Sequence, residues 1–524
     1  MARIGNGGYG AAAETGEPVH DLSNTWALIL LGWIDAIKAT GATLATVSLL
    51  EASQSMGLSA GMRSAAASAI SLAIAATAVA AGVAADRFGR RRMLMISYVL
   101  AGGANLVIYL FPVGIVYVAG LGVAGLGYSV MLTSSYAYTK AVAPGRSLGM
   151  GLGLVAMFTT LIVMATSLGG GALAFLDWKV LFLIIPAMCA VSFVLTPRLL
   201  PPMPRTGSGR VDYVGLALLG AGMVAIVSGV DRVTAHPPDR TGWLFLIAGV
   251  VLFAAWAIVE ARIKRPAFPV RLFRSGKFVA AVIVGLTCPI VTAAIALGLG
   301  DGVQFLRDGS TFAATLALEP FYIAGGVGGL AAGRILRSPG SERRVMTWAP
   351  LIAAAGFVAL APLDPAYPAW LGLPGVILAG LGIGATLTAQ GQVIIRAVGK
   401  ESYGAVTSSK TSISQLGSAL GMVLTMLVVK LAAGLDLWQD LRATGASDAD
   451  VRAVIDGIEN GTAPQTFPDA LDLARDSLET ALHSAMLAAA ALMVATTVVV
   501  WALLRERRAG RRAVDDGAET RTAG

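Results

Sequence analysis

The stretch GVAADRFGRRR, residues 82–92, joins two long apolar segments and contains four arginines. Residues 63–85 precede it and residues 93–111 follow it, and each segment is long enough to cross a hydrocarbon core of about 30 Å as an α-helix. Lysine and arginine gather in the cytoplasmic connections of membrane proteins. The stretch therefore predicts a short cytoplasmic turn between two membrane helices.

Further apolar segments of the same kind lie on both sides of this pair. Only helices and closed barrels satisfy their backbone groups in lipid, and these segments are too long and too evenly apolar for barrel strands. The sequence thus predicts an all-α integral membrane protein with fourteen transmembrane helices, at residues 24–48, 63–85, 93–111, 113–138, 146–172, 179–197, 213–230, 242–261, 278–300, 311–332, 345–362, 369–395, 404–433 and 480–504.

The distribution of Lys and Arg sets the expected orientation. With the N-terminus inside, 28 of the 39 basic residues fall in inward-facing segments, nine fall outside, and Lys38 and Lys410 fall within spans. Moving one boundary by a whole helix would invert this asymmetry downstream. The bias therefore favours fourteen spans, both termini in the cytoplasm, and a multi-pass protein of the plasma (inner) membrane.

Composition agrees with a membrane protein and argues against several other classes. The chain is 56% hydrophobic and 13% charged, whereas a soluble domain carries roughly 25% charged residues. The net charge of +8 is explained by the cytoplasmic membrane face, so no nucleic-acid partner is expected. Cys189 and Cys288 lie inside predicted spans, and we expect neither a disulfide framework nor a metal site or cofactor.

Two short internal repeats divide the chain into related halves. Residues 82–87 recur as 329–334, and AGLG at 124–127 recurs at 379–382, each pair being eight predicted spans apart. Repeated halves with a site between them are typical of secondary transporters. We expect a cytoplasmic N-terminal segment (1–23), a six-helix bundle (24–198), a linker with two extra helices (199–277) and a second six-helix bundle (278–504) that contains an acidic outer loop (434–479). A basic cytoplasmic tail (505–524), disordered beyond the headgroups, is expected to follow.

The opening stretch resembles the signature loop of the major facilitator superfamily, G-x-x-x-D-R-x-G-R-R. The matching positions are Gly82, Asp86, Arg87, Gly89, Arg90 and Arg91. The resemblance implies a latch that holds the cytoplasmic gate closed. In physical terms, Gly82 would permit close helix approach and Gly89 a tight reversal. Asp86 would accept hydrogen bonds from a neighbouring helix N-terminus and pair with Arg90.

Within that superfamily the chain is similar to the fourteen-helix drug:proton antiporters. The resemblance rests on the number of spans, the basic central segment 260–274, the long loop before the last span, and the glycine-rich segments 380–384 and 415–421. Asp35 occupies the position in the first span where this branch carries an acid. Leu121 stands where the branch has an arginine, and Thr166 where it has a proline, so proton coupling and the direction of transport stay open.

Four charged residues lie inside predicted spans: Asp35, Lys38, Glu319 and Lys410. A charge at a helix centre costs about 2.5–3.5 kcal/mol even on the lenient insertion scale, so such residues normally face a cavity or a partner. One interpretation is an internal ion pair between Asp35 and Lys38 that ties helices together. The other is that Asp35 or Glu319 exchanges a proton while a lysine contacts an anionic substrate group. Gln304 and Tyr128 are further candidates for a polar cavity.

The function that we expect is secondary active transport by alternating access, namely proton-coupled export of small amphipathic compounds. The expected partners are a small-molecule substrate, protons and the bilayer, and the protein is expected to be a monomer without enzyme activity. The alternatives are a transporter or flippase of a lipid or lipid-like anion, and a transport-inactive sensor or assembly partner. A membrane-embedded enzyme would need a clustered catalytic set, and the sequence offers none.

Overall fold

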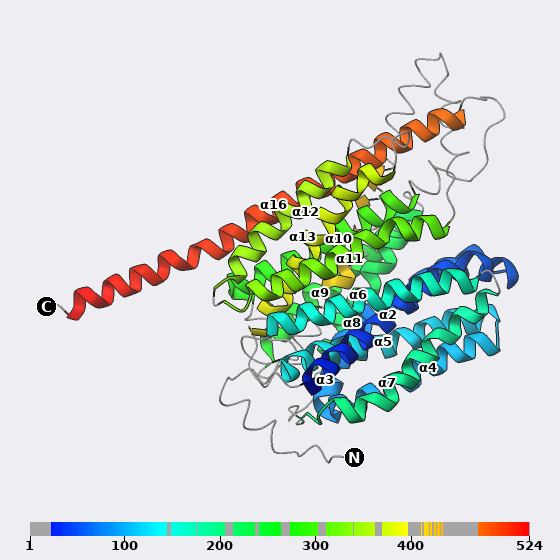
Figure 1. The fold of residues 1–524 in the computed structure, drawn as a ribbon, viewed down its shortest axis with the longest axis horizontal. Coiled ribbons are helices and arrows are strands. Elements are labelled where there is room, and N and C mark those ends of the chain that lie inside the picture. The colour runs from blue at the N-terminus through cyan, green and yellow to red at the C-terminus, as the bar shows by residue number, and fades with distance from the viewer. Residues whose placement is uncertain are drawn as a thin grey trace.

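The computed structural model describes residues 22–522, and it is helical in nearly all of them (Figure 1). Outside the described residues lie the two chain ends and the segments 144–147, 175–176, 204, 206–212, 236–239, 264–272, 302–310, 339, 362–368, 397–409, 411–412, 419, 422–423, 426, 430 and 433–469.

The first half of the chain forms one bundle of long helices. Its elements are α2 (Leu22–Ser55), α3 (Ala60–Phe88), α4 (Arg90–Leu110), α5 (Gly114–Val142), α6 (Leu148–Ala174), the 3₁₀ turn η2 (Trp178–Leu183) and α7 (Ile184–Leu199). Buried aromatic rings fill its core: Tyr117 meets Trp178 and Phe182 edge to face, with ring centroids 6.0 and 5.8 Å apart. In this bundle α2 and α5 lie side by side, which matters for the site below.

The second half forms another bundle around its own core (Figure 1). Its described elements are α10 (Gly276–Asp301), α11 (Thr311–Ile335), α12 (Glu342–Leu360), η5 (Ala369–Gly372), α13 (Leu373–Arg396) and α16 (Ala470–Thr522). Phe278, Met346 and Phe357 are fully buried in this core, and Met493 of α16 joins them.

The helices α8 (Tyr213–Ala235) and α9 (Arg240–Arg262) form a hairpin between the two halves of the sequence. Gly220 of α8 lies directly on α3, because a Cβ atom there would stand 2.7 Å from the carbonyl oxygen of Ala76. Trp256 of α9 packs both on the cluster of Ala75, Val79, Leu219 and Met223 and on the core of the second bundle. The hairpin therefore contacts both bundles, and the proposed domain boundaries at 198 and 278 stay a prediction.

Thirteen of the described helices are long and apolar enough to span a membrane. They correspond to all the predicted spans except 404–433, which lies largely outside the described residues. One expectation is wrong: the tail after Arg505 continues α16 as a helix to Thr522. The reason is composition, since Arg, Ala and Glu, which dominate this segment, are strong helix formers even without apolar packing.

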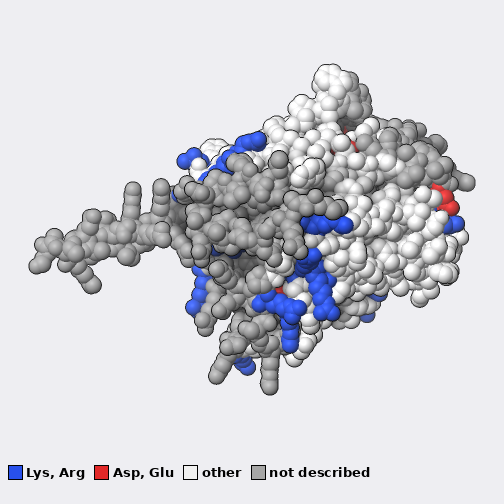
Figure 2. Space-filling view, turned by 60° about the horizontal axis from the view of Figure 1, so that its bottom comes forward, with Lys and Arg blue, Asp and Glu red and all other residues white. Residues whose placement is uncertain are grey.

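Lys and Arg gather at the end of the molecule from which the C-terminal helix projects, whereas most of the flank in view is uncharged (Figure 2). We call this end the basic end. The connection between α3 and α4 and the connection between α11 and α12 both belong to it, with Arg87, Arg92, Arg337 and Arg344 exposed.

The two bundles meet along α6 and α11, and glycine makes their contact close. A Cβ atom on Gly153 would stand 2.6 Å from the carbonyl oxygen of Gly329, and one on Gly333 would stand 2.5 Å from that of Gly149. Both contacts lie toward the basic end, where α6 begins and α11 ends. The bundles are therefore in backbone contact on the basic side.

Candidate functional site

The centre of the candidate site is Asp35, in the middle of α2. Its carboxylate interacts electrostatically with Lys410 and with Lys38, and Ser135 of α5 lies within hydrogen-bonding reach. The Oδ1 atom is buried and has no hydrogen-bond partner in the described part of the chain. Asp35 thus retains an unused acceptor beside two lysines, an arrangement that suits binding of a proton or a polar group.

Lys410 brings the second half of the chain to this centre. Its side chain is 8% exposed, and its Nζ atom donates a hydrogen bond to the hydroxyl of Tyr136 while lying 3.7 Å from the centroid of that ring. Gly391 of α13 adjoins the lysine stem, since a Cβ atom there would stand 3.9 Å from Lys410 Cε and 3.5 Å from Leu152 Cδ1 of α6. Lys410 therefore crosses from one bundle to the other.

The combination can respond to protonation. Asp35 and Tyr136 belong to the first bundle and Lys410 to the second, so their attraction acts across the interface. A charge pair in a poorly solvated site interacts far more strongly than the same pair in water. Neutralising Asp35 would remove the charge attraction between the bundles at this point.

Glu319 lies elsewhere in the interface, on α11 directly before Pro320. Its side chain is 6% exposed, its Oε2 atom has no hydrogen-bond partner among the described residues, and its charge acts on Tyr322 one turn further on. Gly326, two turns along the same face, packs against Met157 of α6. Glu319 is therefore a second buried acid facing the other bundle, farther from the basic end than Gly326.

Tyr128, another predicted site residue, does not join this centre. Tyr128 is fully buried inside the first bundle, where its hydroxyl accepts a hydrogen bond from Asn105 Nδ2 at 3.2 Å and lies against Gly41 of α2. Gln304 lies outside the described residues.

Sequence reasoning missed two residues of this region, Ser135 and Tyr136. Ser135 and Tyr136 belong to the polar run TSSYAYT at 133–139, which interrupts an otherwise apolar helix and could have been noticed for that reason. Gln390 of α13 is fully buried, and neither of its amide atoms has a hydrogen-bond partner in the described part of the chain. Its amide lies against Gly285 of α10, inside the second bundle, because a Cβ atom on Gly285 would stand 1.9 Å from Gln390 Nε2.

The signature loop forms the predicted turn. Gly89 stands at φ +96°, a conformation that side chains disfavour, and it lets α4 begin immediately after α3 ends. Asp86 pairs with Arg90 one helical turn on, and Arg90 is 4% exposed. Arg91 donates to the carbonyl oxygen of Pro197 in α7 at 3.0 Å, which ties the turn to a third helix. Gly82 is buried and Arg87 is exposed; the acceptance of helix N-terminal hydrogen bonds by Asp86 stays a prediction.

The repeated connection in the second half also contains a glycine at positive φ, but its charged residues differ. Gly340 stands at φ +78°, and the position that matches Asp86 is Gly333. Here the ion pair is Glu342 with Arg396, 2.6 Å apart, which joins the start of α12 to the end of α13. In the described part of each half, an ion pair thus lies at the basic end: Asp86 with Arg90, and Glu342 with Arg396.

We predict that Asp86→Asn leaves the protein folded and inserted but favours states open on the basic side and slows turnover. The substitution removes a charge partner of the buried Arg90, and each 1.4 kcal/mol lost shifts a two-state gate about tenfold. Transport rate and labelling of cysteines placed at the basic end measure the effect. Asp177→Asn is the control, because Asp177 pairs with Lys179 (3.5 Å) at an exposed site. Unchanged rate and unchanged labelling in Asp86→Asn would refute the latch.

Comparison with known families identifies the architecture. Residues 31–422 match the Major Facilitator Superfamily. The chain belongs to this superfamily. Members of this family are membrane transporters, and the thirteen apolar helices of the described chain agree with a multi-pass transporter.

Several relatives in this superfamily are named for drug resistance. The chain is 28% identical to the puromycin resistance protein of Streptomyces alboniger over 500 residues, which cover 92% of each protein. It is 23% identical to a methyl viologen resistance protein of Salmonella typhimurium, over 80% of this chain and 86% of the relative. It is 22% identical to a methylenomycin A resistance protein of Bacillus subtilis, over 67% and 76%.

Solved structures show the same fold. A human organic anion transporter superposes with a TM-score of 0.60 at 12% identity, covering 91% of this chain and 99% of the other. A proton:xylose symporter superposes with a TM-score of 0.58 at 13% identity, covering 91% and 95%. At these identities the likeness concerns the fold alone.

Proposed function

We propose that this superfamily transporter is a proton-coupled exporter of small amphipathic compounds in the plasma membrane, acting as a monomer. The observation that carries the proposal is the cluster of Asp35, Tyr136 and Lys410, which places a buried acid and a buried base on opposite sides of the bundle interface. The resistance names of three relatives support export of toxic compounds.

The proposed cycle begins in the state seen here, in which α6 and α11 are in contact on the basic side, taken as cytoplasmic. Lys410 is held by Tyr136 and attracted by Asp35. When a proton neutralises Asp35, that attraction is lost and the bundles are free to separate on the cytoplasmic side. Substrate then enters and contacts the lysine. Release of the proton restores the attraction, closes the cytoplasmic side and commits the substrate to the outside.

A second candidate function is the transport of a lipid-like anion. The centre contains two lysines and one aspartate, so it carries a net positive charge when all three are ionised. Such a centre attracts a negatively charged substrate group, and Lys38 or Lys410 would bind it. This candidate differs from the first in the charge of the substrate, not in the mechanism.

Transport into proteoliposomes tests these proposals. We expect uptake of an amphipathic dye into inside-out vesicles to depend on an imposed pH gradient and to stop when a protonophore collapses the gradient. Uptake that ignores the gradient would reject proton coupling, and uptake confined to anionic dyes would favour the second candidate. Absence of transport for every substrate in a folded protein would favour a sensor or assembly partner.

A further inference from the structure

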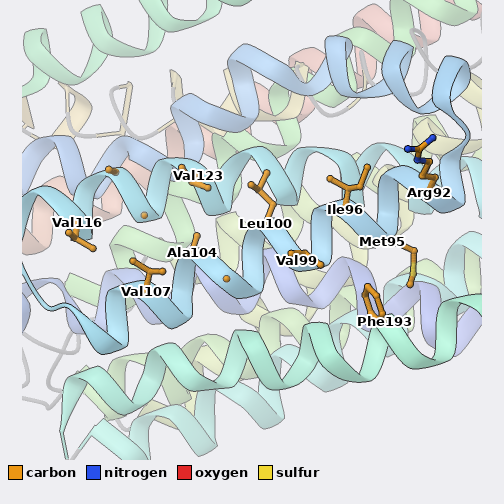
Figure 3. A pocket seen from close by; sticks show the side chains of 13 residues that line it. Arg92, Met95, Ile96, Val99, Leu100, Ala104, Val107, Val116, Val123 and Phe193 are labelled. Carbon is orange, nitrogen blue, oxygen red and sulfur yellow. The ribbon is translucent and has the colours of Figure 1, made fainter.

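A groove runs along the outside of the first bundle, away from the Asp35–Lys410 centre. It has a volume of about 790 Å³ and is lined by side chains of α4, α5 and α7 (Figure 3). Its walls are Val99, Leu100 and Val107 of α4, Val123 of α5 and Phe193 of α7, which are 37–62% exposed. The groove therefore opens onto the surface that faces the hydrocarbon core.

Small residues create this groove. Gly103 of α4 lies on its floor, and a Cβ atom there would have no neighbour within 4 Å. Ala104, Ala119 and Gly120 line the rest of the floor. Larger side chains on either helix would fill the space, so the groove is set by the sequence of α4 and α5.

Among the described residues that line the groove, Arg92 alone is charged, and it lies at one end of the groove. Arg92 stands at the basic end of α4, and the lining residues follow it along the helix as far as Val107 (Figure 3). Fifteen residues of helix extend about 22 Å, against about 15 Å for one leaflet of the hydrocarbon core. Arg91 and Arg198 each donate to a backbone carbonyl, and Arg198 is exposed like Arg92, but of the three only Arg92 lines the groove.

We propose that the groove binds one acyl chain of an anionic phospholipid from the leaflet at the basic end, with the lipid phosphate on Arg92. The apolar walls by themselves do not select among phospholipids, because all carry similar chains and lipid tails are as apolar as the walls. Selection comes from the arginine, which favours an anionic headgroup by about fivefold over a zwitterionic one. The groove fixes where that lipid lies, and its length accommodates a chain that reaches across one leaflet.

Native mass spectrometry of the full-length protein tests the proposal. The protein is released from nanodiscs that contain equal amounts of phosphatidylglycerol and phosphatidylcholine, and the retained lipid is counted. We expect about fivefold more phosphatidylglycerol on the wild type. Arg92→Gln should remove that preference, and Gly103→Leu should remove the retained lipid itself.

Two matched controls separate the site from general effects. Arg344→Gln removes the exposed arginine at the corresponding third position of α12, and Gly122→Leu adds a side chain to α5 where, as at Gly103, a Cβ atom would have no neighbour within 4 Å. Both should retain lipid like the wild type, and thermal unfolding should be the same in each test variant as in its control. Equal loss in a test variant and its control would overturn the proposal. So would full retention in Gly103→Leu, which would mean that the headgroup binds without the groove, or an unchanged preference in Arg92→Gln.

Discussion

Replacing Gly153 with alanine should open the transporter on its basic side and reduce transport. The added Cβ atom would stand 2.6 Å from the carbonyl oxygen of Gly329 and 3.0 Å from the Cα atom of Leu330, so the backbones of α6 and α11 must separate. Overpacking of this kind costs about 1–3 kcal/mol, which corresponds to a shift of about 5- to 150-fold in the equilibrium between the two states. Spin labels on cysteines that replace Arg198 and Arg337, both exposed at the basic end, would report a longer label-to-label distance in the variant.

Gly169→Ala is the matched control for this experiment. Gly169 lies on the same helix, and a Cβ atom there would have no neighbour within 4 Å. Both substitutions exchange glycine for alanine in a helix and so gain the same helix propensity, of roughly 1 kcal/mol. An unchanged label distance and full transport in Gly153→Ala would show that the α6–α11 contact does not control access.

The second large effect concerns Asp35 and Lys410. Removing one member of a buried charge pair costs about 3–5 kcal/mol, because the other member is left uncompensated. Asp35→Asn and Lys410→Met should each lower the unfolding temperature strongly, and the double variant should recover much of the loss. Asp35→Asn should also abolish gradient-driven transport while substrate binding or passive exchange persists. The double variant should therefore be stable but uncoupled.

The corresponding single and double variants of Glu342 and Arg396 provide the control. This pair, 2.6 Å apart at the basic end, should show coupled effects on stability while gradient-driven transport continues. If Asp35→Asn transports against a gradient at the normal rate, the proton is carried elsewhere. Glu319→Gln is then the variant to examine, because Glu319 is a second buried acid inside a membrane span of the described chain.

The fold could be predicted because hydrophobic length and charge asymmetry are local properties of the sequence. The turn at Gly89 was predictable for the same reason, since a glycine between two helices marks a conformation that other residues avoid. The helical tail after Arg505 was mispredicted because polarity was interpreted as disorder, although the residues there favour a helix.

The site was predictable only in part. Burial cost marks Asp35, Lys38, Glu319 and Lys410 as unusual, but it does not say which of them meet. The i,i+3 spacing drew attention to Lys38, whereas Lys410 reaches Tyr136 from 274 positions away in the chain. Such pairing depends on how the two bundles pack against each other, which a local sequence pattern does not predict. Tyr128 was proposed for a cavity and lies instead against Gly41, since the sequence does not show which face of α5 turns toward α2.

The α8–α9 hairpin has a mechanical consequence. Because it touches α3 through Gly220 and the second core through Trp256, any rocking of the bundles must move one of these contacts. In water such a displacement would expose apolar surface, at a free-energy cost of about 25 cal/mol for each Å². In a bilayer, acyl chains replace the lost neighbours and are equally apolar, so the displacement costs little. Because lipid replaces the lost contacts, the hairpin can contact both halves and still allow them to move relative to each other.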